Sequence, residues 1–390
     1  MNTSVIAQML AGVGLLVVMI PAWAWGNHRS GSIALPEATV VGDFNEDGHV
    51  DVAVINTGFD QVAILLGDGY GTLTLKGLLP VDTLPKDIQV ADLNQDGHED
   101  LMVSNTWGYN VLLFFGDGQG GFSRVDELDG DEPLGITVAN FTGDGHLDIA
   151  AATKGKEVLV FLSRGQGRFR TPPVGVTAQN PFNPFSVTNG HFNADGHLDI
   201  AVTDRLNDTV FALLGDGAGS FTPTPSVPVS NLPAHLTTGD LDENGTLDLV
   251  VGGGLPENAD GIFLAILLGD GAGNFVLTRN LNFGPGKLEG QVVLEDFNED
   301  GHLDVAVAPG SRPGGPLDDV WVLLGNGRGN LGPVTKFQVG REPHGIVVAD
   351  FDENGHQDML VSNRGEATVS VLLGNGAGEF MLAGTFSVLP

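Results

Sequence analysis

Residues 350–380 read DFDENGHQDMLVSNRGEATVSVLLGNGAGEF. The first nine residues have acidic or amide side chains at positions 1, 3, 5 and 9, among others, and a glycine at position 6. Two short aliphatic runs follow, and they are too short for helices and rich in the residue types found in β-strands. The Gly-Asn-Gly step supplies the positive φ angles of a tight hairpin. The stretch therefore predicts an acidic loop, two strands, a hairpin and a further strand.

The same unit occurs seven times. A further apolar run precedes each acidic segment, so each unit has four strands. Four strands in about 50 residues, repeated seven times, predict an all-β, seven-bladed β-propeller of four-stranded antiparallel blades, with the DxDxDGxxD loop between strands 1 and 2. A solenoid is the structural alternative. The acidic segments are 48 to 56 residues apart and begin at Asp43, Asp92, Asn140, His191, Asp240, Asp296 and Asp350.

The predicted domain boundaries follow from these repeats. We expect one propeller over residues 36–390, with blades at about 36–84, 85–132, 133–183, 184–232, 233–288, 289–342 and 343–390. Six repeats have a proline seven residues before the acidic loop, where a first strand can begin without an N–H donor. Residues 25–35 are predicted to be a short linker.

The N-terminal segment resembles an export signal. Residues 1–24 contain an apolar stretch that ends in Ala22-Trp23-Ala24, an A-x-A-like cleavage site, although no basic residue precedes it. An uncleaved N-terminal anchor is the alternative. We therefore expect a secreted, cell-surface or periplasmic protein whose mature chain has no membrane span.

The composition excludes several kinds of partner and site. The formal net charge is −32, from 17 basic and 49 acidic residues, which argues against binding to nucleic acid. The chain has no cysteine, so thiolate metal sites and disulfides are excluded. Repulsion within such an acidic fold favours bound cations.

The acidic loop has the composition of a calcium site. We number its positions 1 to 9, from Asp43 to Asp51 in the first repeat. Calcium takes six to eight oxygen ligands, which the side chains at positions 1, 3, 5 and 9 and the backbone carbonyl at position 7 can supply. Strands rather than helices flank the loop, so it is not an EF-hand. The predicted metal ligands are Asp43, Asn45, Asp47, His49, Asp51, Asp92, Asn94, Asp96, His98, Asp100, Asn140, Thr142, Asp144, His146, Asp148, Asn193, Asp195, His197, Asp199, Asp240, Asp242, Asn244, Thr246, Asp248, Asp296, Asn298, Asp300, His302, Asp304, Asp350, Asp352, Asn354, His356 and Asp358.

The seven loops are unequal, so the chain is expected to bind up to seven calcium ions. Five loops have three Asp at ligand positions, whereas the third begins with Asn140 and the fourth with His191. For these two loops a turn held by side-chain hydrogen bonds without metal is the alternative. Six loops have His at position 7, which we interpret as a backbone ligand with an imidazole that faces solvent.

The two alternating motifs resemble the FG-GAP/VCBS repeat family, whose best-known members are the N-terminal propellers of integrin α subunits. The resemblance covers about residues 36–390. It implies that the residues matching Asp43, Asn45, Asp47, His49 and Asp51 bind calcium between the first two strands of each blade, and it does not specify an activity.

The opposite face carries the variable loops, where binding residues usually lie. By our assignment eight basic residues lie there, namely Lys86, Lys154, Lys156, Arg205, Lys287, Arg312, Arg341 and Arg364. A ligand on this face is expected to be an extracellular protein or glycan, with an anionic ligand as one option. The predicted ligand-binding residues are Trp107, Tyr109, Arg205, Arg312, Arg341, His344 and Arg364.

The sequence contains no nucleophile elbow, P-loop, HExxH motif or dinucleotide-binding fingerprint. The favoured function is therefore a non-catalytic binding or adhesion module with structural calcium. One alternative is a carbohydrate-active propeller, either a polysaccharide lyase or a lectin, that uses the same variable face. For a lyase the candidate residues are His235, His344, Tyr109 and Arg341, and a scaffold within an envelope complex is a third possibility.

Overall fold

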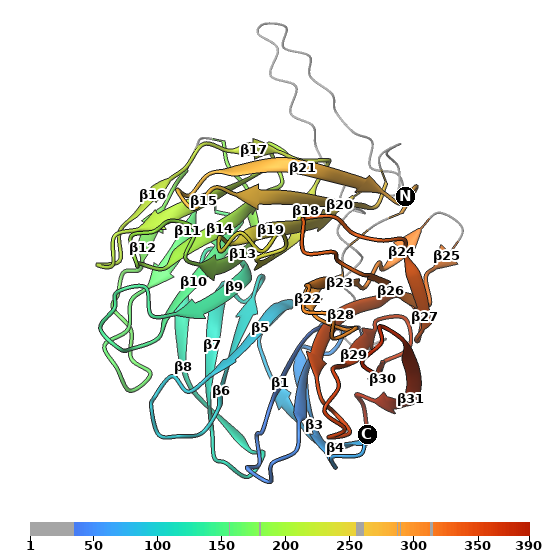
Figure 1. The fold of residues 1–390 in the computed structure, drawn as a ribbon. Helices are drawn as coiled ribbons and strands as arrows, with labels where there is room; N and C mark the ends of the chain where they lie inside the picture. The colour runs from blue at the N-terminus through green and yellow to red at the C-terminus, as the bar shows by residue number, and fades with distance from the viewer. Residues whose placement is uncertain are drawn as a thin grey trace, which may run out of the picture.

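The computed structural model describes residues 35–390 apart from 156, 179–180, 255–260, 287, 289 and 313–314. These residues form a ring of seven blades, each an antiparallel sheet with its four main strands in chain order (Figure 1). The predicted all-β, seven-bladed propeller is confirmed. The predicted signal peptide or anchor, and nearly all of the predicted linker, lie outside the described residues. Within the described part, no helix is suited to crossing a bilayer.

The strands of blades 1 to 4 have the following bounds. Blade 1 contains β1 (Pro36–Gly42), β2 (Asp51–Asn56), β3 (Gln61–Gly67) and β4 (Leu73–Pro80). Blade 2 contains β5 (Pro85–Ala91), β6 (Asp100–Asn105), β7 (Asn110–Gly116) and β8 (Phe122–Asp129). Blade 3 contains β9 (Pro133–Ala139), β10 (Asp148–Thr153), β11 (Val158–Phe161) and β12 (Val174–Val176). Blade 4 contains β13 (Pro184–Gly190), β14 (Asp199–Asp204), β15 (Thr209–Gly215), β16 (Phe221–Pro223) and β17 (Val227–Pro228).

Blades 5 to 7 complete the ring. Blade 5 contains β18 (Pro233–Gly239), β19 (Asp248–Gly253), β20 (Phe263–Gly269) and β21 (Phe275–Asn282). Blade 6 contains β22 (Val292–Glu295), β23 (Asp304–Val307), β26 (Asp319–Leu323) and β27 (Thr335–Gln338), with a small hairpin of β24 (Ser311–Arg312) and β25 (Gly315–Pro316). Blade 7 contains β28 (Pro343–Ala349), β29 (Asp358–Asn363), β30 (Thr368–Gly374) and β31 (Phe380–Ser387).

The first strand of each blade lies at the centre of the ring. First strands of adjacent blades contact one another around the whole ring, including β28 against β1 (Figure 1). Six of them begin at the prolines noted in the sequence, where a missing N–H is tolerated. Because blade 7 packs on blade 1, the ring is closed, and the solenoid alternative is wrong.

The blades pack face to face through their middle strands. Every residue of β2 and of β29 is buried, whereas β31, at the outer edge, is largely exposed. The aromatic residue at position 2 of an acidic loop adds to this packing, since the Phe44 ring lies edge-on to Phe122 of the next blade, with 5.3 Å between ring centroids. Similar ring pairs join blades 3 and 4, 4 and 5, and 6 and 7. Each acidic loop is therefore fixed against the blade that follows it.

Candidate metal centre

The acidic loops connect the first and second strands of the blades. Position 6 is a glycine with φ between 81° and 95° in all seven loops, a conformation that disfavours a Cβ. Position 4 also has positive φ in six loops: it is Gly143 in blade 3 and Glu46, Gln95, Glu243, Glu299 or Glu353 in the others. In blade 4 the residue at position 4 is Ala194, which does not adopt positive φ. The fourth loop therefore has a different backbone path.

Position 9 is a fully buried Asp in every blade. In blade 1, Asp51 Oδ2 accepts the N–H of Phe44 at 3.0 Å, and Oδ1 accepts the N–H of Gly67 at 2.8 Å. Equivalent bonds, from position 2 and from the residue near the end of the third strand, occur in all six other blades. This Asp thus joins the start of the acidic loop to the hairpin of its own blade.

The electrostatic environment of position 9 favours a cation. Burial raises the pKa of this carboxyl because the ionised form loses hydration, and the two backbone N–H donors offset only part of the effect. The pKa is raised to about 6 for Asp51, Asp100, Asp248, Asp304 and Asp358, and it is also raised for Asp148 and Asp199. A bound divalent cation would stabilise the ionised form.

Two loops bring three carboxylates together. Oxygens of Asp240, Asp242 and Asp248 in blade 5 all lie within 4.8 Å of one another, as do those of Asp350, Asp352 and Asp358 in blade 7. Oxygens bound to one calcium ion at roughly 2.4 Å can be at most about 4.8 Å apart. The loops of blades 5 and 7 therefore fit the donor spacing of a calcium ion through positions 1, 3 and 9.

Blades 1, 2 and 6 have a variant of this loop. Position 3 is Asn and position 5 is Asp, and in blade 1 the Asn45 Nδ2 donates to Asp47 Oδ2 at 2.9 Å. The carboxylate at position 1 is held inside the loop, because Asp43 accepts the N–H groups of Asp47 and Gly48. Blades 2 and 6 repeat this arrangement. In these three loops, positions 1 and 9 each supply a carboxylate and position 3 supplies an Asn carbonyl oxygen.

The loops of blades 3 and 4 replace metal ligands with internal hydrogen bonds. In blade 3 the Thr142 hydroxyl donates to Asp148 Oδ2 at 3.3 Å. In blade 4 the His191 Nδ1 lies 2.8 Å from the carbonyl oxygen of His197, the position-7 oxygen expected to bind calcium. An imidazole N–H thus takes the bond that an ion would make. These contacts favour the metal-free alternative for both loops.

The position-7 imidazoles do not simply face solvent, so our interpretation of them was incomplete. His49 Nδ1 lies 2.5 Å from Glu353 Oε1 of blade 7, and His98 pairs in the same way with Glu46 of blade 1. His302 with Glu243, and His356 with Glu299, repeat the contact. The hydrogen bond to Glu raises the pKa of each of these four imidazoles. Position 4 of one loop is therefore linked to position 7 of the next, across four of the seven blade junctions.

Each Glu–His pair lies against the hairpin of the blade that carries the histidine. A Cβ on Gly69, whose φ is 69°, would come within 2.6 Å of His49 Nδ1 and 2.7 Å of Glu353 Oε1. The hairpins also bind the preceding loop directly, since the N–H of Gly71 donates to the carbonyl of Phe351 at 2.9 Å. The same backbone bond recurs at five more junctions. The acidic loops and hairpins thus form a belt of contacts across six of the seven blade junctions.

The predicted ligand-binding residues lie in several environments. Trp107 and Tyr109 are 44% and 55% exposed in the turn between β6 and β7, and Arg341 is also exposed. The Arg205 guanidinium lies 3.3 Å from the centroid of the Phe185 ring. The Arg312 side chain, Lys156 and Lys287 lie outside what the structure describes, so their assignments stay predictions.

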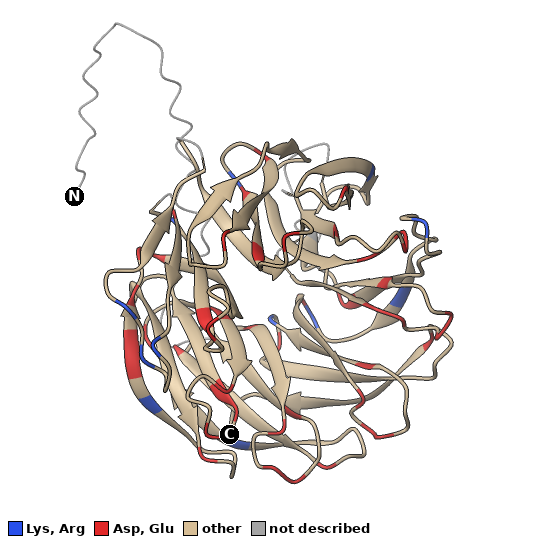
Figure 2. Ribbon diagram, turned by 60° about the vertical axis from the view of Figure 1, so that its left-hand side comes forward, with Lys and Arg blue, Asp and Glu red and all other residues tan. Residues whose placement is uncertain are grey.

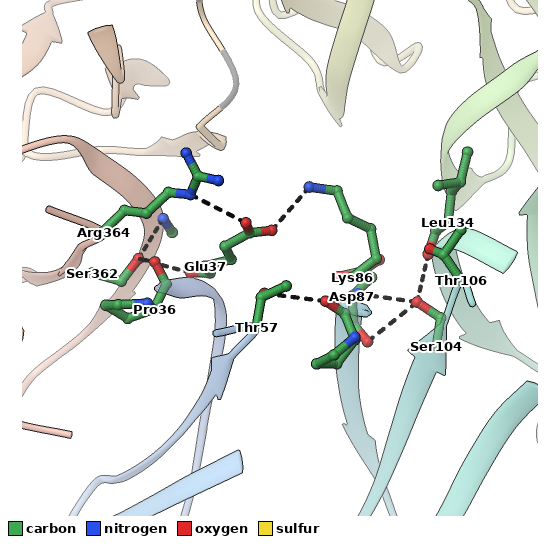
Figure 3. A network of polar contacts seen from close by, with 12 residues as sticks. Pro36, Glu37, Thr57, Lys86, Asp87, Ser104, Thr106, Leu134, Ser362 and Arg364 are labelled. Carbon is green, nitrogen blue, oxygen red and sulfur yellow. Dashed lines mark hydrogen bonds and ion pairs between the residues drawn. The ribbon is translucent and has the colours of Figure 1, made fainter. Parts of the chain in front are cut away.

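Arg364 and Lys86 meet at a carboxylate that the sequence did not single out, Glu37 (Figure 3). Glu37 is 4% exposed, and its two oxygens bind Lys86 Nζ at 2.9 Å and Arg364 Nε at 3.2 Å. Burial acts to raise the pKa of Glu37, but Lys86, His344 and Arg364 outweigh it and hold that pKa far below its usual value. The network joins blades 7, 1 and 2, and its only sequence signal is a charged residue after the proline of the first strand.

Acidic residues are spread over most loops of the ring, and basic residues are few (Figure 2). Comparison with known proteins identifies the repeat. The FG-GAP-like repeat matches residues 43–103, 92–151, 191–251 and 296–361, which together cover more than half of the chain. None of the curated proteins matches the chain.

Solved structures share the fold at low sequence identity. BBS1N, from a complex with ARL6DN, has 12% identity and a TM-score of 0.60, over 92% of this chain and 95% of the other. The periplasmic gluconolactonase of Pseudomonas aeruginosa has 18% identity and a TM-score of 0.59, over 90% and 96%. A Lactobacillus plantarum protein has 14% identity and a TM-score of 0.61, over 91% and 97%. These similarities concern the fold alone.

Proposed function

Since the chain belongs to the proteins built of FG-GAP-like repeats, we propose that it is an exported calcium-binding propeller that acts as a non-catalytic binding module. Its calcium ions are structural. Its ligand, an extracellular protein or glycan, binds on the face opposite the acidic loops.

The observation that carries the calcium proposal is the carboxylate triad in blades 5 and 7. Three Asp side chains from positions 1, 3 and 9 converge there within 4.8 Å. One of them is fully buried and held by two backbone N–H donors, so its orientation is fixed before an ion arrives. Hard carboxylate oxygens on a short loop suit calcium better than a transition metal.

The belt of contacts explains why the calcium would be structural. In blade 7, an ion at positions 1, 3 and 9 would fix the acidic loop. That loop binds the hairpin of blade 7 through Asp358, and it binds the hairpin of blade 1 through the carbonyl of Phe351. Loss of the ion would leave several carboxylates close together without a counter-charge. Calcium would thus stabilise the packing between blades.

The placement of the ligand rests on the contrast between the two faces. The acidic loops and hairpins repeat with little variation, whereas the connections on the other face differ in length and include the extra β24–β25 hairpin. Variable loops on a rigid scaffold are the usual place for binding residues. The A-x-A-like site at residues 22–24 supports export.

Counting bound ions tests the proposal. The purified protein, dialysed against calcium and analysed by plasma mass spectrometry, should retain about five ions per chain, from the loops of blades 1, 2, 5, 6 and 7. Fewer than one ion per chain at millimolar calcium would contradict it.

A further inference from the structure

The acidic loop of blade 3 has fewer acidic residues than the loops of blades 1, 2, 5, 6 and 7. Its loop has Asn140 and Thr142 at positions 1 and 3, and the neighbouring blade 2 has Gln95 rather than Glu at position 4. Gln95 donates its amide N–H to the carbonyl of Gly145 rather than to a histidine. In four other blades the position-7 imidazole pairs with a carboxylate through its Nδ1 atom. The Nδ1 atom of His146 is instead buried without a hydrogen-bond partner. The belt of Glu–His pairs stops at blade 3.

The hairpin of blade 3 adds positive charge at the same place. Four other hairpins have an Asp at the tip and two have Asn, whereas blade 3 has Arg164, followed by Arg168 and Arg170. All three arginines are exposed. In the part of the chain that the structure describes, none of them forms an ion pair or a side-chain hydrogen bond, although the chain has 49 acidic residues.

The backbone holds this hairpin in place. The N–H of Arg164 donates to the carbonyl of Arg168 at 2.7 Å, and the N–H of Gly167 donates to the carbonyl of Leu93 in blade 2 at 3.2 Å. A Cβ on Gly167 would overlap the ring of Phe115, so the hairpin is packed closely on blade 2. The three guanidinium groups are therefore carried by a fixed scaffold rather than by a loose loop.

We propose that Arg164, Arg168 and Arg170 form a binding surface for an anionic glycan on the face that carries the acidic loops. Arginine guanidinium groups bind carboxylate and sulfate groups through paired N–H donors. At physiological salt the Debye length is about 8 Å, so acidic groups beyond that distance are largely screened. This surface is additional to the ligand face of the proposed function and does not depend on it.

The chemistry of the surface favours a glycan over a protein partner. Protein interfaces usually have an apolar core. Among the described residues, the large exposed apolar side chains lie elsewhere, and the hairpin presents Gln166 and the three arginines to solvent. A linear polyanion needs only charge and hydrogen bonds along its length.

The test compares two triple variants of equal net charge in the calcium-loaded full chain. One is R164Q/R168Q/R170Q. The control, K76Q/R279Q/K336Q, removes three basic residues from outer strands of other blades. Binding to immobilised polygalacturonate, heparin, polyglutamate and neutral dextran is measured from 50 to 300 mM salt, and melting temperature reports folding.

We expect the wild type and the control to bind one or both anionic glycans in a salt-sensitive way and not to bind dextran. The hairpin variant should bind at least tenfold more weakly without a lower melting temperature. The preferred glycan then distinguishes a carboxylate from a sulfate ligand. The proposal is overturned if the wild type binds neither anionic glycan, if both variants lose affinity equally, or if it binds polyglutamate and no glycan. None of these results bears on whether calcium stabilises the fold, which a separate melting experiment with chelator decides.

Discussion

Blades 5 and 7 and blades 3 and 4 have the same strand order but opposite loop chemistry. In blades 5 and 7 the carboxylates at positions 1, 3 and 9 converge, whereas in blades 3 and 4 only position 9 keeps its Asp. Position 9 makes the same two backbone hydrogen bonds in all four blades. The comparison separates two roles: position 9 builds the blade, and we propose that positions 1 and 3 determine whether a cation is held.

The Glu–His pairs follow the same division. They link blades 5, 6, 7, 1 and 2 in sequence, and in the described residues they are missing where blades 3 and 4 meet their neighbours. The ring thus has a sector cross-linked by Glu–His pairs and, among the described residues, a sector without them. The predictions below test whether this division is functional.

Removal of calcium should give the largest effect. Ions bound only to the folded chain stabilise it by mass action, about 2.7 kcal/mol per site at a concentration 100 times the dissociation constant. With several sites, EDTA should lower the melting temperature by about 10 °C or more. Added calcium should restore it, and magnesium should not, because magnesium requires a rigid octahedral site. An unchanged melting temperature in EDTA would contradict the proposal that calcium stabilises the loops of blades 1, 2, 5, 6 and 7.

The pH dependence should change sign when calcium is removed. Without calcium, the position-9 carboxyls of blades 1, 2, 5, 6 and 7 have a folded pKa raised to about 6, above that of the unfolded chain, so the stability present at low pH is lost as the pH rises through 6. The melting temperature in EDTA should therefore rise from pH 7.5 to pH 5. With calcium it should fall over the same range, because protons compete with the ion. Parallel slopes in scanning calorimetry would contradict this.

Removal of one carboxylate should have a smaller effect that depends on the blade. Asp352→Asn keeps a hydrogen-bond acceptor at position 3 of blade 7 but removes a charge from the triad. We expect one fewer calcium ion per chain and a melting temperature about 3 °C lower in calcium, with no change in EDTA. Asn193→Ser, at the same position of blade 4, is the matched control and should leave the ion count unchanged. An equal loss of ions in both variants would argue against the difference between the blades.

The loop of blade 3 should be easier to convert into a calcium site than that of blade 4. Gly143 already has positive φ at position 4, as in blades 1, 2, 5, 6 and 7, whereas Ala194 does not. The substitutions N140D/T142D should therefore add one calcium ion, measured by isothermal titration. H191D/N193D should add none or bind more weakly, since a left-handed Ala costs about 1–2 kcal/mol. Equal gains in the two variants would show that the backbone path does not matter.

Loss of one Glu–His pair should give the smallest effect. Glu46 and His98 are both substantially exposed, and such surface pairs contribute little to stability because solvent screens them. Glu46→Gln should lower the melting temperature by about 1–2 °C at pH 6 and by less at pH 8, where the imidazole is less often charged. Glu366→Gln, on an exposed turn, is the control for loss of charge. A drop above about 5 °C would mean that the pair has a larger structural role than its exposure suggests.

Much of the fold followed from the sequence because it depends on local signals that repeat. The aliphatic runs, the glycine hairpins and the prolines at the start of first strands each act within one blade. The Glu–His pairs were missed because Glu46 and His98 lie in different repeats, and only the ring brings position 4 of one loop next to position 7 of the next. Glu37 was missed for the same reason, since its partners Lys86 and Arg364 come from two other blades.

The composition of the loops in blades 3 and 4 identified them as weaker candidate calcium sites. The contacts that take the place of an ion there could not be predicted from the sequence. His191 was recognised only as a missing carboxylate. The structure shows that its imidazole contacts the carbonyl of His197, which depends on the backbone path of the loop and cannot be read from residue types.

The most direct test of the central claim is an anomalous difference map of crystals grown with calcium, recorded at a long wavelength. The account predicts peaks in the loops of blades 1, 2, 5, 6 and 7, among them one enclosed by Asp240, Asp242 and Asp248 and one by Asp350, Asp352 and Asp358, and no peak beside His191. Empty loops in blades 5 and 7, or seven equal peaks, would contradict it.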